Sequence, residues 1–169
     1  VDVIRSRAFN YAKISAVTIS KDVLIVGDYA FSNCRSLKSI VFEGGRTLPV
    51  SVSSGSFVGC YAVTEITLPA LIKGPGEDDA FDVKTLNTLT SLETVSVERV
   101  TGAYFSSVDG MLCNDLGDTV LYCPLGYTGI SGILTVPKGI TAIGDGTFSG
   151  RTAFTEVVIP NYVTKIGAN

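Results

Sequence analysis

Histidine and tryptophan are both absent from this sequence of 169 residues. Without imidazole, the chain cannot build a Ser-His-Asp triad, a Cys-His pair or a zinc site that relies on histidine. It also lacks the side chain that most often moves protons near neutral pH. The sequence therefore excludes the commonest hydrolytic and zinc-dependent active sites.

Charged residues are also few, at 17% against 46% hydrophobic residues, and the formal net charge is −3. The 13 basic residues are scattered along the chain, which argues against nucleic-acid binding because such binding needs a basic patch. The apolar runs are short and interrupted, so we expect no membrane insertion by this segment. A chain of this length and apolar content can bury a substantial core, and disorder is not expected.

Four cysteines are present, without the Cys-x-x-Cys spacing that indicates a metal or redox site. Cys34 and Cys60 each follow a phenylalanine by three residues, so we expect them at equivalent positions of adjacent repeats. Stacked side chains point in parallel, which favours buried free thiols over a disulfide. Cys113 and Cys123 flank a predicted hairpin around residues 114–118. No cofactor is predicted.

An acidic cluster, Glu77-Asp78-Asp79 with Asp82 nearby, lies in an irregular insertion over residues 70–91. Carboxylates of this kind can hold a hard cation, but the spaced ligand pattern of an EF-hand is missing. We therefore favour a solvated loop and predict no metal site. The same acids are the only clustered carboxylates for acid/base catalysis, and glycosidase chemistry needs two of them facing each other across a cleft.

What the sequence does contain is a repeat. One kind of segment follows the pattern apolar-x-x-apolar-x-apolar, and its middle apolar residues are Val17, Ile40, Ile66, Val95, Leu121, Leu134 and Val157. A second kind, Ile/Val-Gly-Asp-x-x-Phe, occurs at residues 26–31 and 143–148. Residues 136–144 align with residues 159–167 at a shift of 23. Repetition at this length is typical of a solenoid.

Each repeat predicts one coil. The alternation of apolar residues predicts a strand with one buried face. The 3-and-4 spacing of Ala30, Phe31, Cys34 and Leu37 predicts a single helical turn. A glycine after Ile or Val suits a sharp turn with positive φ. We expect each coil to hold a strand, a helical turn and an extended return, and the seven strands to form one parallel sheet.

Residues between the buried apolar positions should face away from the core. The central row of these outward positions holds Thr18, Val41, Thr67, Ser96, Tyr122, Thr135 and Val158. The flanking row holds Ala16, Ser39, Glu65, Thr94, Val120, Ile133 and Glu156. One interpretation is a sheet face selected for strand propensity; the other is a ligand-binding face, since solenoids present extended surfaces to partners. We favour ligand binding for the face as a whole, because the sequence offers no other site.

Residues 27–40 and 135–148 resemble BspA-like leucine-rich repeats, as do residues 108–114 through Tyr122-Cys123-Pro124. The resemblance covers nearly the whole chain and is weakest over 70–91. It implies a β-rich α/β solenoid, a right-handed leucine-rich-repeat superhelix with a parallel sheet on its concave face and short helical turns. It also implies a secreted or cell-surface location and a part in adhesion.

The predicted function is a non-catalytic, adhesion-type module that binds an extracellular protein or glycan. A structural spacer without a ligand is the main alternative, and a carbohydrate-active enzyme that uses carboxylates alone is the third. We expect residues 1–169 to form a single solenoid domain. The sequence begins without an initiator methionine and ends where the next phenylalanine is due, so we expect a fragment of a longer protein, with open solenoid ends that allow self-association.

Overall fold

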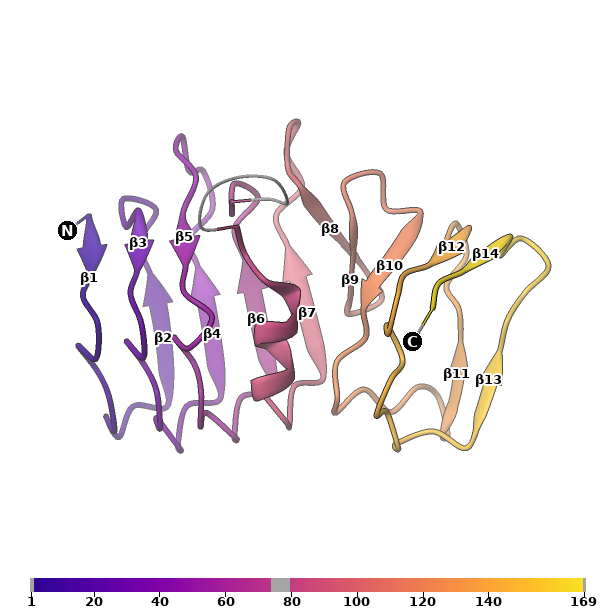
Figure 1. The fold of residues 1–169 in the computed structure, drawn as a ribbon, viewed down its shortest axis with the longest axis horizontal. Coiled ribbons are helices and arrows are strands. Elements are labelled where there is room, and N and C mark those ends of the chain that lie inside the picture. Colours follow the sequence, from indigo (N-terminus) through magenta and orange to yellow (C-terminus); the bar gives the residue numbers. More distant parts are fainter. Residues whose placement is uncertain (1, 74–79, 169) are drawn as a thin grey trace.

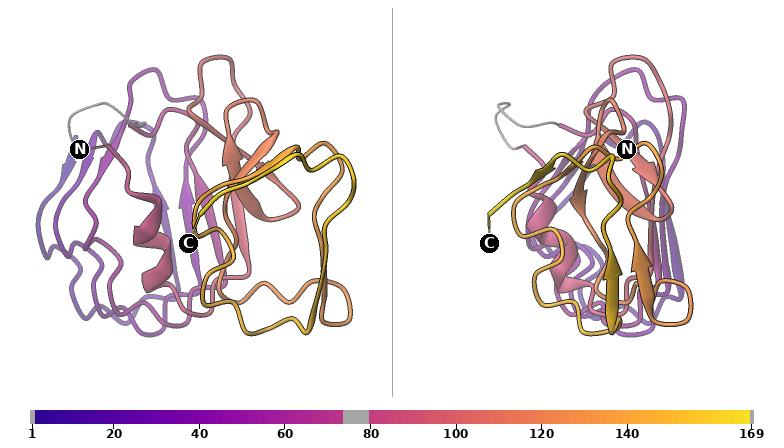
Figure 2. Two further views of the ribbon diagram at one scale, coloured as in Figure 1. Left: turned by 45° about the vertical axis from the view of Figure 1, so that its right-hand side comes forward. Right: turned by 90° about the vertical axis from the view of Figure 1, so that its right-hand side faces the viewer.

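The computed structural model describes residues 2–73 and 80–168. The chain winds into a solenoid whose coils stack along one axis (Figure 1). Viewed along that axis the coils overlap, and the C-terminal coils are turned relative to the N-terminal ones (Figure 2). Its elements, in chain order, are β1 (Val3–Ile4), β2 (Ala16–Ile19), β3 (Ile25–Val26), β4 (Ser39–Phe42), β5 (Ser51–Val52), β6 (Glu65–Leu68), the 3₁₀ helix η1 (Val83–Thr88), β7 (Thr94–Val97), β8 (Phe105–Val108), β9 (Met111–Asn114), β10 (Thr119–Tyr122), β11 (Ile133–Thr135), β12 (Ala142–Ile143), β13 (Glu156–Val158) and β14 (Lys165–Ile166).

Four of the predicted repeat strands form one parallel sheet in the order β2-β4-β6-β7. Val17, Ile40, Ile66 and Val95 are direct partners across it, which confirms the first four members of the predicted column. Leu134 and Val157 are partners in a separate pair of strands and do not join this column. The alternation of buried and outward side chains fixes this register, because a slip of one residue would turn the apolar set toward solvent. The returning segments form a second parallel sheet, β1-β3-β5, and an isolated bridge between Val50 and Ile72 extends its edge.

The prediction of one continuous sheet of seven strands is wrong. The strands β8, β9 and β10 pair antiparallel, and β10 continues in parallel into the return strands β12 and β14. The later repeat strands β11 and β13 form a separate pair. Asp109 and Gly110 have positive φ angles of 49° and 80°, which suits the tight turn between β8 and β9. This local hairpin interrupts the stack of parallel strands.

The helical turn predicted around Phe31 is also absent. Residues 28–33 form hydrogen-bonded turns instead, with Ala30 N–H donating to the Gly27 carbonyl and Ser32 N–H to the Tyr29 carbonyl. Tyr29 and Asn33 have φ angles of 56° and 58°. A left-handed residue cannot continue a right-handed helix, so these two residues end each turn after a few residues. Among the described residues, η1 is the one helix.

The glycine of the Ile/Val-Gly-Asp motif has a different role from the predicted one. Neither Gly27 nor Gly144 has a positive φ. A Cβ atom on Gly27 would instead lie 2.9 Å from the Ser6 nitrogen, and one on Gly144 would lie 3.0 Å from the Val120 carbonyl oxygen. Glycine is required here because the backbones of adjacent coils approach too closely for any side chain.

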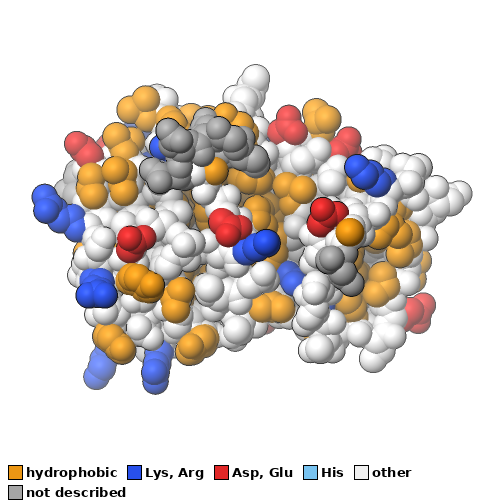
Figure 3. Space-filling view, viewed as in Figure 1, with side chains coloured by type: hydrophobic (Ala, Val, Ile, Leu, Met, Phe, Trp, Pro, Cys, Tyr) orange, Lys and Arg blue, Asp and Glu red, His pale blue; other side chains and the backbone are white. Residues whose placement is uncertain are grey.

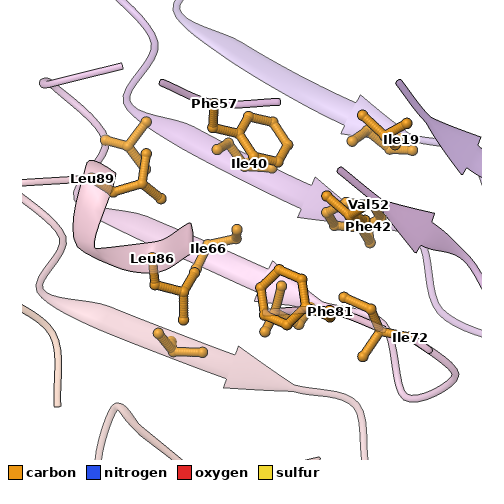
Figure 4. Packing of buried hydrophobic residues seen from close by; sticks show 14 of the residues in the cluster. Ile19, Ile40, Phe42, Val52, Phe57, Ile66, Ile72, Phe81, Leu86 and Leu89 are labelled. Carbon is orange, nitrogen blue, oxygen red and sulfur yellow. The ribbon is translucent and has the colours of Figure 1, made fainter. Parts of the chain in front are cut away.

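The core lies between the two layers of strands and divides into two clusters of buried residues. The larger cluster runs from Ile19 to Tyr122, and Figure 4 shows Ile40, Ile66 and neighbouring side chains stacked along it. Leu86 and Leu89, from η1 and the residue that follows it, add to this cluster. The smaller cluster, from Met111 to Ile143, fills the C-terminal coils.

The irregular segment contains η1, whose N-terminus is capped by Asp82: the carboxylate oxygen accepts a hydrogen bond from the Lys84 N–H at 2.9 Å. In Figure 1 this helix lies on the side of the return strands, in front of β6 and β7. Glu77, Asp78 and Asp79 lie outside the described residues. η1 stands where the neighbouring coils have an extended return.

Candidate functional site

The outer surface of the β2-β4-β6-β7 sheet, here called the strand face, carries the predicted rows. Its central row is Thr18, Val41, Thr67 and Ser96, which are direct partners on adjacent strands. Its flanking row is Ala16, Ser39, Glu65 and Thr94. All eight side chains are exposed or half-buried. The sheet therefore presents two aligned ladders of mostly small, β-branched or hydroxyl side chains.

The same pattern recurs on the separate pair β11-β13. Ile133 lies opposite Glu156, and Thr135 lies opposite Val158. All four side chains are exposed. On β13 the predicted alternation is absent, because Val157, predicted to face the core, is exposed as well. The pair β11-β13 is a sheet of its own and does not continue the strand face.

Tyr122 and Val120 do not belong to either row. Tyr122 is only 3% exposed, and Val120 is fully buried. Both lie on β10, which pairs with β9 and β12 and not with the strand face. The prediction that they face solvent is wrong, because this pairing turns Val120 and Tyr122 inward and leaves Leu121 half-buried.

All four cysteines are free and buried. The Cys34 thiol donates to the Phe9 carbonyl oxygen at 3.1 Å, and the Cys60 thiol donates to the Phe31 carbonyl oxygen at 3.0 Å. Burial raises the pKa of Cys60 and of Cys113 to about 11, and that of Cys123 to about 12. Such thiols are poor nucleophiles at neutral pH because the thiolate is scarce. Cys34 and Cys60 bond to carbonyls of the preceding coil, whereas the Cys113 and Cys123 thiols contact the carbonyls of Met111 and Pro124 in their own segments.

A cleft of about 610 Å³ lies between η1 and the turn at residues 145–151. Its apolar lining consists of Phe81, Val83, Leu121, Tyr122 and Leu125. Its polar lining consists of Asp82, Lys84, Asn87, Asp145, Gly146, Ser149 and Arg151. The space-filling view shows apolar surface in a hollow near the centre of this side, with acidic and basic side chains beside it (Figure 3). No sequence pattern groups these residues, since they come from three distant segments.

Arg151 links the two sides of this cleft. Its Nε donates to the Cys123 carbonyl oxygen at 2.7 Å, and its Nη2 donates to the same oxygen and, at 3.4 Å, to Oδ1 of Asn87. Its guanidinium lies 4.9 Å from the centre of the Tyr122 ring, a cation–π contact. Burial raises the pKa of Tyr122 to about 12, and the positive charge of Arg151 partly opposes this. Arg151 thus connects η1 to the C-terminal coils.

The cleft brings two carboxylates onto one surface, Asp82 and Asp145. Both side chains are exposed. Asp82 caps η1, and Oδ1 of Asp145 accepts a hydrogen bond from the Ala168 N–H at 2.9 Å. Each carboxylate therefore has a structural role in its own segment. Across the described ranges 2–73 and 80–168, no group of three or more Cys, Asp or Glu residues is placed to hold a metal ion.

A family profile described as the BspA type leucine rich repeat region matches residues 2–110 and 128–169, in six copies. Comparison with curated proteins gives no match. Within the part of the chain that the structure describes, no helix has the length and apolar character needed to cross a membrane.

Solved structures of three proteins match this chain, and the first of them shares its fold. The pneumococcal vaccine antigen PcpA matches with a TM-score of 0.65 and 23% identity over 99% of this chain. A leucine-rich repeat protein from Eubacterium ventriosum matches with a TM-score of 0.44 and 18% identity over 94% of this chain. A leucine rich cell surface protein from Faecalibacterium prausnitzii matches with a TM-score of 0.43 and 17% identity over 99% of this chain. The chain spans 39% of the first structure, 57% of the second and 61% of the third.

Proposed function

Because the chain belongs to the BspA-type leucine-rich repeat family, we propose that it is a non-catalytic binding module of a secreted or cell-surface protein. Its ligand is an extracellular protein or glycan, and the strand face is the surface that binds it. The observation that carries this proposal is the alignment of Thr18, Val41, Thr67 and Ser96 in one outward row across four adjacent strands.

The chemistry of the strand face suits recognition. Hydroxyl groups of Thr18, Thr67 and Ser96 can each donate and accept a hydrogen bond. Val41 adds an apolar surface in the middle of this row, where a purely solvated face would not need one. Parallel strands hold all of these groups on a rigid backbone, so binding does not require the backbone to become ordered first.

The extracellular location belongs to the same proposal and rests on family membership. An extended, regular face made by stacked coils is the feature that solenoids use to contact partners. A spacer that only projects another domain would need the apolar column of Val17, Ile40, Ile66 and Val95, but it would not need Val41 on the outside. The two functions therefore differ in what they require of the outer row.

A binding screen with a matched pair of variants tests the proposal. The wild-type chain is applied to an array of extracellular matrix proteins and glycans, and a hit is then compared with Val41→Glu and Ile25→Glu. Val41 is half-buried on the strand face, whereas Ile25 is exposed on the return strand β3. We expect Val41→Glu to weaken binding at least about tenfold, which corresponds to about 1.4 kcal/mol, while Ile25→Glu leaves it unchanged.

Both variants should melt near the wild-type temperature, because neither residue is part of the buried core. If no ligand on the array binds the wild-type chain, or if Ile25→Glu weakens binding as much as Val41→Glu, the proposal is wrong. The first outcome favours the spacer, and the second places binding on the return strands.

A further inference from the structure

η1 lies on the side of the return strands, away from the strand face (Figure 1), and borders the cleft together with residues 145–151. We propose that this cleft is a second binding site, and that its ligand is a neutral saccharide of one or two sugar units. The proposal is independent of the strand face, because none of the residues that line the cleft belongs to β2, β4, β6 or β7.

The size and lining of the cleft are those of a small-molecule site. Its volume of about 610 Å³ lies within the usual range of roughly 300–1,000 Å³ for ligand pockets. Val83, Leu121 and Leu125 are half-buried and supply apolar surface, and Asn87 and Ser149 are exposed polar groups at its edge. An apolar floor with a few convergent polar groups is the usual composition of such a site.

The charges of the cleft select against an ionic ligand. One wall carries Asp82 and Lys84, and the other carries Asp145 and Arg151. A phosphate or carboxylate ligand would approach two carboxylates, and a cationic ligand would approach two basic groups. A neutral ligand avoids both repulsions. It can also use both kinds of group, provided that it carries hydrogen-bond donors and acceptors together.

Saccharide hydroxyls meet this requirement, because each donates and accepts, and the C–H faces of a sugar ring can lie on the apolar floor. Tyr122 contributes its ring to the lining, while its hydroxyl is buried out of reach of a ligand.

The wall of the cleft is held in place before any ligand arrives. Arg151 donates to Asn87 on η1 and to the Cys123 carbonyl beneath it, so the two walls are joined by hydrogen bonds. A peptide is a poorer match, because extended peptides usually bind by adding a strand to a free edge. β10 is paired along both of its edges, with β9 and with β12, and offers no such edge here.

Titration followed by ¹H–¹⁵N NMR of the whole chain tests the site. The probes are glucose, galactose, mannose, N-acetylglucosamine, N-acetylgalactosamine, maltose, lactose and cellobiose, each up to about 20 mM, because millimolar dissociation constants are expected for a small open site. We expect at least one of them to give saturable shifts confined to the amides of Val83, Lys84, Asn87, Leu125, Ser149 and Arg151. A capped neutral tetrapeptide at the same concentration should not shift them.

Variants assign these shifts to the cleft. Ser149→Trp fills the cleft from an exposed position and should weaken binding at least tenfold, whereas Ser36→Trp, an equally exposed serine on an N-terminal turn, should not. Lys84→Ala removes one exposed donor and should weaken binding several-fold without altering the fold.

The proposal is overturned if no sugar gives saturable shifts, or if the shifts lie outside the cleft. It is also overturned if Ser149→Trp binds as well as the wild-type chain, or if only the tetrapeptide binds. Because Val41→Glu leaves the cleft intact, failure here and failure of strand-face binding are separate results.

Discussion

The rings of Phe31 and Phe57, from adjacent coils, stack with their centroids 5.6 Å apart and their planes within 11° of each other. Phe9, one coil earlier, stacks on the opposite side of Phe31 at 5.1 Å. The Cys60 thiol donates to the carbonyl of Phe31 beside this stack. One phenylalanine per coil, repeated in register, therefore links three coils through their side chains.

Replacement of Phe31 by alanine should cost about 3–5 kcal/mol of unfolding free energy, because a fully buried phenylalanine leaves a cavity that its neighbours cannot fill. Phe31 is 1% exposed, whereas its stacking partner Phe9 is 45% exposed. Phe9→Ala is thus the matched control and should cost distinctly less. Urea denaturation measures both values, and an equal cost for the two variants would show that the stack does not organise the core.

Two substitutions of Tyr122 separate the contribution of its buried ring to stability from that of its hydroxyl. Tyr122→Ala should lower the melting temperature strongly, because the ring is part of the larger core cluster. Tyr122→Phe should leave stability unchanged or raise it by up to about 1 kcal/mol, since the buried hydroxyl has no hydrogen-bond partner among the described residues. Calorimetry distinguishes the two variants. A large loss in Tyr122→Phe would mean that the hydroxyl is satisfied in solution.

Gly27 tests the close approach of adjacent coils. Its substitution by alanine places a Cβ atom 2.9 Å from the Ser6 backbone nitrogen and 3.1 Å from the Ile4 carbonyl oxygen, so the two coils must separate. We expect a loss of about 1–3 kcal/mol, the usual cost of overpacking. Gly44→Ala is the control, because the added atom there meets only the flexible carboxylate of Glu98. Comparable melting temperatures for the two variants would contradict this role.

The buried thiols predict a loss of stability in alkali. Burial raises the pKa of Cys60 and Cys113 from about 9 to about 11, and the pKa of Cys123 to about 12. Between these limits the unfolded chain has released protons that the folded chain still holds, so the free energy of unfolding falls as pH rises. The contribution is fully present below about pH 9 and is lost progressively toward pH 11–12.

Urea titrations in the presence of a reducing agent, at pH values from about 8 to 11, measure this fall. Each proton that only the folded chain retains makes the free energy of unfolding fall by about 1.4 kcal/mol for each pH unit. Cys60→Ala should make the slope shallower, because it removes one such group. A stability that stays constant or rises over this range would show that the thiols are not buried as described.

The stack of N-terminal strands was predictable because two independent signals agree there. Strict alternation around Val17, Ile40 and Ile66 fixes which side faces inward, and the repeat fixes which strand follows which. At β10 the first signal disappears: Val120, Leu121, Tyr122 and Cys123 are all apolar, so alternation cannot decide which pair is buried. The pairing of β10 with β9 and β12 decides it.

The cleft was not predictable for a related reason. Its lining comes from residues 81–87, 121–125 and 145–151, and only the fold brings these segments together. The longer spacing from Phe81 to Leu92 did indicate that this coil departs from the others. Likewise Asp109-Gly110 is a turn signal, but its effect on the order of the strands depends on contacts that no local pattern encodes.

The proposal that the strand face binds the ligand can be tested most directly by mapping the footprint of an array-identified ligand with methyl NMR. The account predicts that the methyl signals of Ala16, Thr18, Val41 and Thr67 shift or broaden on binding, while those of Val3 and Ile25, on β1 and β3, do not move. Perturbation of Val3 and Ile25 with no change at Val41 would contradict it.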